Sequence, residues 1–304
     1  MQFVPFTFCS DVVGHFEDLA LFAELFSTDS AWHSAVSTHR ERREEFKLSL
    51  MHTADPTVWR YAFFEELFSL EDLMARDPRY TRVRFFTLGT VADDLYDISL
   101  DDLHSKLIPF VIQRFFYGTG EPRVTFLTEP SELSAEHLAT VNTLVRRFQD
   151  LDYVGNLRLW NYGQTTEKTL EHFLQKKGLR AVLLHGKWSK ESFVQVLRRT
   201  KRSAIRSFQF LKSDLDFDEE LMAEFIAAWR NGDFRGKTIY LSAKTFPSED
   251  ALCALMPDAE LDELSRFWTC YYEDQETLSV TRNVEMEYKE NRNWIHVYPY
   301  TYKS

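Results

Sequence analysis

The pattern that most constrains the fold is an alternation of short strand-type runs and capped helical runs between residues 82 and 271. The strand-type runs, rich in β-branched, aromatic and leucine residues, recur roughly every 30 residues. Ser134, Ser189 and Asp216 are suitable N-cap residues for helical runs between them. The alternation therefore predicts parallel strands joined by helical crossovers. The predicted strands are 83–88, 124–127, 157–160, 182–185, 207–210, 239–241 and 267–271.

Two architectures satisfy this alternation: a doubly wound α/β sheet, and an α/β solenoid of the leucine-rich-repeat kind. Within the runs, apolar and polar residues alternate, so that Arg158 lies between two leucines and Gln209 between two phenylalanines. A sheet covered by helices on both faces would be apolar at nearly every strand position. The pattern therefore favours an irregular leucine-rich-repeat-like solenoid over residues 82–265, with one exposed sheet face. The regular Asn and Leu ladder of such repeats is absent.

In such a solenoid, alternate strand residues line the concave face and point away from the core. Trp, Tyr and Arg are the residue types most enriched in interface hot spots. The alternative is that Trp160 packs back onto the solenoid and that the other outward residues are merely solvated. We expect a target-binding row at Arg158, Trp160, His185, Gln209 and Tyr240. The residues expected to point inward are Val124, Phe126, Leu157, Leu159, Phe208, Phe210, Ile239 and Leu241.

The C-terminal segment, residues 266–304, carries a different pattern. Apolar and aromatic residues alternate with polar ones across 277–288 and again across 292–300. This alternation predicts two antiparallel strands. Because the last repeat of a solenoid must shield its edge strand, we expect this aromatic hairpin to cap the array.

The N-terminal segment is predicted to be helical over residues 1–50, followed by a linker helix region over 51–81 that is either one helix or a short strand plus a helix. Leu19 and Phe22 are spaced for one face of a helix. No Lys or Arg precedes Arg40, whereas five acidic residues do. Such an acidic, aromatic helical surface is suited to a partner. The alternative is a helical cap that only closes the solenoid.

Charge and composition argue against several classes of function. The net charge of −11 is opposite to the basic footprint of a general nucleic-acid binder. No apolar run approaches the ~20 residues of a membrane span, and no basic region of a signal peptide precedes the apolar N-terminus. The three cysteines, Cys9, Cys253 and Cys270, are widely spaced, which fits reduced thiols in the cytoplasm or nucleus.

Motifs for catalysis or cofactor binding are also missing from the sequence. There is no P-loop, no His-Glu-x-x-His, no Gly-x-Ser-x-Gly and no Cys-x-x-Cys. We therefore expect no cofactor, no metal site and no enzymatic activity; a diverged enzyme on an α/β sheet is the alternative. The basic run 198–202 ends a predicted helix, where cations are favoured. A nuclear-localisation signal or a patch for an acidic partner is the other interpretation of this run.

About the first 40 residues resemble an F-box, the helical module of ubiquitin-ligase substrate receptors. The gap between Pro5 and Asp11 is longer than is typical, and Ser30-Ala31 replaces the usual Ser/Cys-Lys pair. The similarity lies in a Val4-Pro5 opening, Asp11-Val12-Val13 as the first helix, Asp18-Leu19 with Phe22 and Leu25 as the second, and the late Trp32.

This resemblance implies a non-catalytic adaptor that docks onto a Skp1-like protein and, through it, onto a cullin. An F-box-like N-terminus before a degenerate repeat array is similar to the lineage-expanded F-box families of nematodes, whose arrays are taken to bind target proteins, including pathogen or toxin proteins. A stand-alone antidote that blocks its target by occupancy is the alternative. The implied Skp1-binding residues are Pro5, Phe6, Phe8, Val12, Leu19, Phe22 and Trp32.

Overall fold

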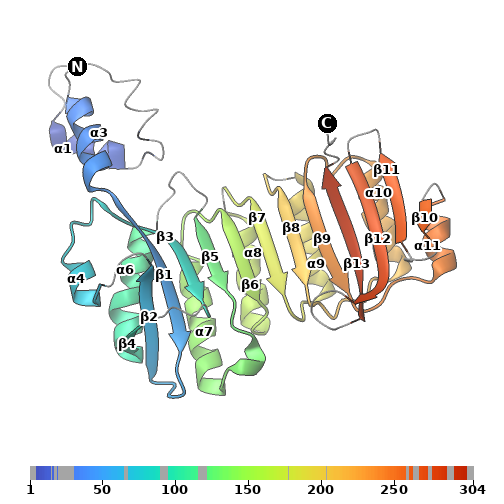
Figure 1. Ribbon diagram of the computed structural model, residues 1–304, viewed down its shortest axis with the longest axis horizontal. Coiled ribbons are helices and arrows are strands. Elements are labelled where there is room, and N and C mark those ends of the chain that lie inside the picture. Colours follow the sequence, from blue (N-terminus) through green and yellow to red (C-terminus); the bar gives the residue numbers. More distant parts are fainter. Residues whose placement is uncertain are drawn as a thin grey trace. The chain divides into compact units, whose positions relative to one another are not determined.

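The chain folds into two compact units, Met1–Asn156 and Leu157–Ser304. Each unit is an α/β structure built on a mixed sheet, so the predicted α/β class is confirmed (Figure 1). The boundary between the units falls inside the range 82–265 that we expected to form one array. The computed structural model describes residues 5–14, 16, 19, 31–64, 68–89, 95–115, 122–176, 178–202, 204–257, 260–262, 267–272, 276–285 and 291–299.

The first unit begins with a small helical module made by α1, Phe6–Gly14, and α3, Ala31–Arg42. The two helices pack against each other around a core of their own. The buried members of this core are Cys9, Val13, Leu19, Ala35 and Val36, and Ala31 and Trp32 pack against them.

The sheet of the first unit has the strand order β5-β3-β1-β2-β4. Strand β3 is parallel to β1 and to β5, whereas β1–β2 and β2–β4 are antiparallel pairs. The strands are β1 Glu44–His52, β2 Val58–Phe64, β3 Thr81–Leu88, β4 Tyr96–Ser99 and β5 Arg123–Phe126.

Residues 44–50 correct the prediction of a helical module to residue 50. Helix α3 ends at Arg42, and β1 starts at Glu44. The mixed charges just before residue 46 are typical of an exposed helix, but alternate residues from Phe46 to Leu50 are buried, which is the period of a strand. In the linker region, β2 is followed by the helix α4, Leu70–Met74, which agrees with the alternative of a short strand plus helix. The N-terminus of α4 is closed by a capping box between Ser69 and Asp72.

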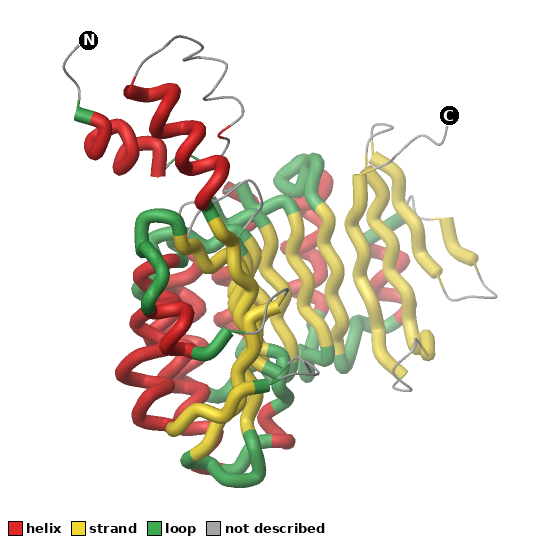
Figure 2. The backbone as a smooth tube through the Cα atoms, turned by 60° about the vertical axis from the view of Figure 1, so that its left-hand side comes forward, coloured by secondary structure: helices red, strands yellow, loops and turns green. Residues whose placement is uncertain are grey.

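The helices of the first unit pack on its sheet through phenylalanines. The ring of Phe148, on α7, lies 4.2 Å from that of Phe86 on β3 and 5.9 Å from that of Phe126 on β5. Figures 1 and 2 show α6 and α7 on one face of this sheet. The helical segments are α5 Leu100–Asp102, the π-helical turn Leu103–Leu107, α6 Ile108–Arg114, the 3-10 turn Pro130–Glu132 and α7 Ala135–Phe148.

The sheet of the second unit has the strand order β6-β7-β8-β9-β13-β12-β11-β10. Strands β7, β8 and β9 are parallel, and each pair from β9 to β10 along that order is antiparallel. The strands are β6 Asn156–Trp160, β7 Ala181–His185, β8 Ser207–Leu211, β9 Thr238–Ala243, β10 Glu260–Asp262, β11 Phe267–Tyr272, β12 Glu276–Glu285 and β13 Asn291–Pro299.

Helices cover one face of strands β6–β9. In both views, α8, Gln164–Leu174, α9, Lys190–Arg202, and α10, Glu219–Arg230, lie on the same side of this sheet, and no described helix covers the other side (Figures 1 and 2). All eight residues predicted to point inward are buried in their units. The alternate positions of β7 and β8 are only half-buried. This one-sided covering agrees with the polarity pattern; the leucine-rich-repeat arrangement itself stays a prediction.

The predicted helix starts are confirmed at two N-caps and differ at a third. Ser134 and Ser189 accept hydrogen bonds from backbone N–H groups three residues ahead. Helix α10 is capped by Asp218 rather than by Asp216, whose carboxylate accepts a hydrogen bond from Thr245 instead. In α11, Glu249–Leu255, Ser248 has the capping role.

Strands β12 and β13 form the expected antiparallel pair. They do not only cap the array, however, because β13 lies next to β9 within the sheet of the second unit. Strand β13 pairs with β9 on one side and with β12 on the other. Ile295 and Val297 of β13 are buried. Strand β11, predicted as the last repeat strand, is instead antiparallel to β12.

Candidate functional site

The first candidate surface lies on helix α1. Phe6 and Phe8 are 41% and 54% exposed, and Pro5, just before the helix, is exposed as well. The ring of Phe8 meets that of Trp32 edge-on, with 6.2 Å between the ring centroids. Phe16, beyond the end of the helix, is 40% exposed. Large apolar side chains in contact with water are typical of surfaces that bind a partner.

The residues implied by the F-box resemblance occupy different layers of this module. Val12 is half-buried, whereas Leu19 belongs to the buried core between the helices. Trp32 is partly buried and packs against that core. Phe22 lies outside the described residues. Among the described residues, Pro5, Phe6 and Phe8 are therefore available to a partner, and Leu19 and Trp32 support the helices that carry them.

The module is tied to the sheet of its own unit through the C-terminal end of α1. Arg43 donates hydrogen bonds to the carbonyls of Phe16 at 2.9 Å and Val13 at 3.2 Å, and Arg82 of β3 donates to that of Gly14 at 3.4 Å. The last carbonyls of a helix have no partner within the helix, and cations are favoured there. The sequence does not predict the role of these arginines, because no local pattern marks a side chain that caps a distant helix.

A buried histidine completes this attachment. The ring of His39 on α3 donates from Nε2 to the carbonyl of Ser10, at 2.8 Å, and lies 4.9 Å from the ring of Tyr80. Burial lowers the pKa of His39, and the neighbouring charge of Arg43 adds to this, while the bond to Ser10 opposes it. The neutral imidazole is therefore the form that fits between α1 and α3.

The second candidate surface is the uncovered face of β6–β9, which we call the open face. In the register of the parallel strands, Leu183 lies beside Gln209, and Gln209 beside Tyr240. His185 and Leu211 are paired one step further along the same face. All five side chains are half-buried. The structure thus brings three of the predicted target-binding residues, His185, Gln209 and Tyr240, onto one surface.

Trp160 joins this face by stacking on His185. The two rings lie 5.2 Å apart with 21° between their planes, and the ammonium of Lys212 lies 5.4 Å from the Trp160 ring centroid. Trp160 is only 9% exposed. A Cβ atom added at Gly186 would lie 2.9 Å from the indole, so the indole fills the space over that glycine. The alternative in which Trp160 packs back onto the protein therefore describes its position better than an exposed anchor does.

Burial and two nearby cations lower the pKa of the His185 ring. Burial lowers the pKa of His185 to about 4, with Lys212 and then Arg158 as the further causes. Its Nδ1 atom is buried without a hydrogen-bond partner among the described residues. At neutral pH the ring is therefore an uncharged platform for Trp160. Arg158, half-buried on β6, and Lys212 give this part of the open face a positive potential.

The turns that hold this stack are fixed by polar contacts. The carbonyl of His185 accepts hydrogen bonds from the indole N–H of Trp188 at 2.8 Å and from the backbone N–H of Asn161 at 3.0 Å. The side chain of Asn161 donates to Glu167 at 2.9 Å. These positioning residues lie between strands, where the alternation of strand residues carries no information about them.

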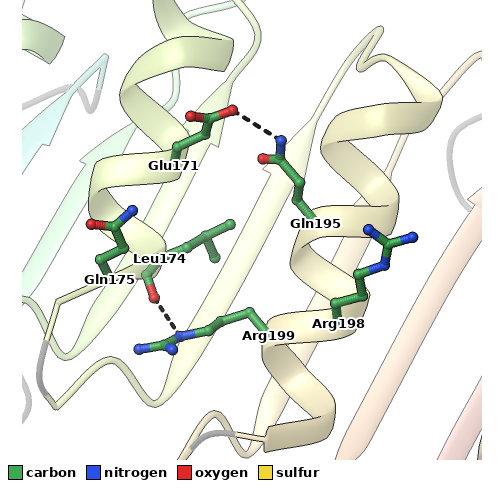
Figure 3. A pocket seen from close by; sticks show the side chains of 6 residues that line it. All are labelled: Glu171, Leu174, Gln175, Gln195, Arg198 and Arg199. Atoms are coloured by element: carbon green, nitrogen blue, oxygen red, sulfur yellow. Dashed lines mark hydrogen bonds between the residues drawn. The ribbon is translucent and has the colours of Figure 1, made fainter.

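A shallow groove of about 440 Å³ lies on the helical side of the second unit, between α8 and α9 (Figure 3). Gln195 donates to Glu171 across it at 2.9 Å, and Arg199 donates to the last carbonyl of α8, at Leu174, at 2.7 Å. Arg199 thus caps a neighbouring helix, and Lys201 lies 3.7 Å from Asp233. These contacts give part of the basic run 198–202 a structural role.

In the part of the chain that the structure describes, no group of three His, Cys, Asp or Glu residues is placed to hold a metal ion. The same residues include no helix both long and apolar enough to cross a membrane. No protein-family model, curated protein or solved structure matches this chain. The two candidate sites are the surface on α1 in the first unit and the open face in the second.

Proposed function

We propose that this chain is the substrate-recognition subunit of a Skp1–cullin–F-box type ubiquitin ligase. The helical module docks onto a Skp1-like adaptor, and the open face of an irregular leucine-rich-repeat-like array binds the protein that is to be ubiquitinated. The observation that carries this proposal is the pair of exposed phenylalanines, Phe6 and Phe8, on a helix with its own small core.

Physical reasons support a docking role for this helix. Exposed aromatic side chains next to a well-packed core are typical anchors of protein interfaces, and a few such residues carry most of the binding free energy. The ties from Arg43 and Arg82 hold the helix on the sheet of its unit, so that a bound adaptor is held together with the rest of the receptor. A stand-alone antidote would use only the open face and would leave Phe6 and Phe8 without a role.

The test is binding of the purified chain to a purified Skp1-like protein, measured by calorimetry. Each truncated anchor is expected to cost roughly 2 kcal/mol, so the double variant Phe6→Ala/Phe8→Ala should lose roughly 4 kcal/mol and bind about 1000-fold more weakly. Met74→Ala is the matched control, since it removes an exposed apolar side chain from α4, outside the module. Undiminished binding after removal of residues 1–40 would rule out the adaptor role.

A further inference from the structure

The imidazole of His39 connects the two helices of the N-terminal module. It lies on α3 and is only 1% exposed. Its Nε2 atom lies 2.8 Å from the carbonyl oxygen of Ser10 on α1 and 3.1 Å from the Ser10 hydroxyl. A carbonyl oxygen only accepts hydrogen bonds, so Nε2 carries the proton of the neutral ring. A second proton would therefore have to bind at Nδ1.

The surroundings of Nδ1 do not suit a second proton. This atom is buried and has no hydrogen-bond partner among the residues that the structure describes. Once protonated, it would be a charged donor without an acceptor, and an unpaired buried charge is one of the most costly arrangements in a protein interior. In the closed module, in which Nε2 is bonded to Ser10, water does not reach Nδ1.

The charges around the ring also oppose a second proton. The guanidinium groups of Arg43 and Arg82 both donate to carbonyls at the end of α1, and both disfavour the charged form of His39. A Cβ atom built on Gly14 would lie 3.4 Å from Arg82 Nη2 and from His39 Cε1, so the two side chains border the same space. The charged and titratable groups around the ring are Asp11 on α1, Arg43 before β1, Asp77, Arg79 and Tyr80 before β3, and Arg82 on β3.

The nearby carboxylates do not offset these cations at the ring. Asp77 is bonded to Arg79 at 2.6 Å. Glu45 of β1 is paired with Arg84 at 3.0 Å. Asp11 is exposed to solvent. The pKa of His39 is accordingly lowered, with burial as the largest cause and Arg43, Arg82 and Arg79 as further ones.

Of the two helices, α1 is the one that can separate from the rest. Helix α3 runs into β1 after a single residue, Arg43. Helix α1 is held instead by the small core and by the polar contacts from His39, Arg43 and Arg82. A positive charge on His39 acts on all three polar contacts, because it removes the fit of the imidazole and repels the two arginines.

We propose that protonation of His39 releases α1 from α3, so that the closed N-terminal module opens in acid. Above about pH 6.5 the ring is neutral in both forms, and the closed form is fully stable. Below that pH the open form, with Nδ1 in water, binds the proton more tightly, so its share rises as the pH falls. The release does not depend on the proposed function. If α1 carries the adaptor anchors, acid also weakens adaptor binding.

The test follows the thiol of Cys9, which is fully buried in the closed module. The full chain is labelled at pH 7 and pH 5 with a dithiodipyridine reagent, and peptide mass spectrometry identifies the labelled cysteine. Each rate is divided by that of the urea-unfolded chain at the same pH. This relative rate should be at least about tenfold higher at pH 5, because opening gains up to about tenfold for each pH unit below 6.5. In His39→Gln, whose amide donates to Ser10 but takes up no proton, it should not change.

Two other histidine variants are the matched controls. His33→Gln changes an exposed histidine on the same helix, and His185→Gln removes the titrating ring of the second unit. Both should keep the full rise in the Cys9 rate. A rate that does not rise in acid, or a rise that persists in His39→Gln, would overturn the inference.

A second measurement covers the case in which His39→Gln does not fold. In an NMR titration of the unaltered chain, the His39 ring should titrate at a lower pH than the histidines of the urea-unfolded chain. Titration at the same pH or above it would overturn the inference. If the Skp1-like protein does not bind at pH 7 but the Cys9 rate still rises in acid, the adaptor role is rejected and the release of α1 stands.

Discussion

The indole of Trp160 stacks on the imidazole of His185, with their ring centroids 5.2 Å apart and their planes inclined by 21°. The two residues end neighbouring strands, β6 and β7. Because the imidazole of His185 can take up a proton, the stability of this stacked contact depends on pH.

The first prediction concerns pH. The pKa of His185 in the folded protein, about 4, is below the value of about 6.5 for an unfolded chain. Between these values the unfolded state binds more protons, so stability is complete above about pH 6.5 and falls as the pH is lowered toward 4. We expect a loss of roughly 2 kcal/mol between pH 7 and 5. Urea unfolding followed by tryptophan fluorescence measures it.

The control for this titration is His185→Gln, which should reduce the difference in stability between pH 7 and 5. His39 shifts in the same direction, so part of the pH dependence remains in that variant. If the variant keeps the full dependence, the His185 ring is not the group that titrates.

The second prediction concerns Gly186. Gly186→Ala should lower the free energy of unfolding by about 3 kcal/mol, because a Cβ atom would meet both a positive φ and the Trp160 ring at 2.9 Å. Gly232→Ala is the control, since its φ is also positive but nothing lies within 4 Å of the added atom. It should cost only about 1 kcal/mol. Equal losses in the two variants would mean that the indole gives way freely.

The third prediction separates the two aromatic residues of the open face. Trp160→Ala should cost about 3 kcal/mol or more of stability, because the side chain is 9% exposed and stacked. Tyr240→Ala removes a half-buried side chain, so we expect a loss of about 1 kcal/mol and weaker binding of the target protein. Melting curves measure the loss of stability, and binding titrations with the target protein measure the loss of affinity. A Tyr240 variant with full affinity would remove Tyr240 from the binding surface.

The fourth prediction concerns the C-terminal strands. A protein that ends at residue 265 lacks β11, β12 and β13, and so leaves the edge of β9 without its antiparallel neighbour. Uncovered edge strands pair with other chains, so this protein should melt at a lower temperature and aggregate. Size-exclusion chromatography and thermal melts report both effects. A monodisperse protein with an unchanged melting temperature would show that β13 contributes little to the second unit.

The sequence predicts the repeated strands well because their alternation is local. The strands at 207–210 and 239–241 lie within β8 and β9 of the structure. Strand β1 escapes prediction, because the charged residues before it continue the polarity of α3. The sequence also does not predict that β13 lies beside β9, because the pairing of two distant segments produces no pattern in the sequence of either segment.

In the candidate sites, too, the sequence predicts the features that depend on a local pattern but not those that depend on contacts between distant segments. Which residues share the open face follows from the two-residue period of a strand, and His185, Gln209 and Tyr240 lie together as expected. The burial of Trp160 does not follow from that period, because it depends on the space above Gly186 in the next turn. The strand pattern also does not predict the position of Lys212, because that position depends on a left-handed backbone conformation after β8.

The pairing of β13 with β9 also sets an order of events during synthesis. Strands β10, β11 and β12 all leave the ribosome after β9 and before β13. Until residues 291–297 have emerged, β9 cannot acquire the neighbour that it has in the finished sheet. During that interval, neighbouring nascent chains on one messenger RNA each expose the unpaired backbone edge of β9. The second unit is therefore most in need of chaperone protection late in translation, when most of its core has already been made.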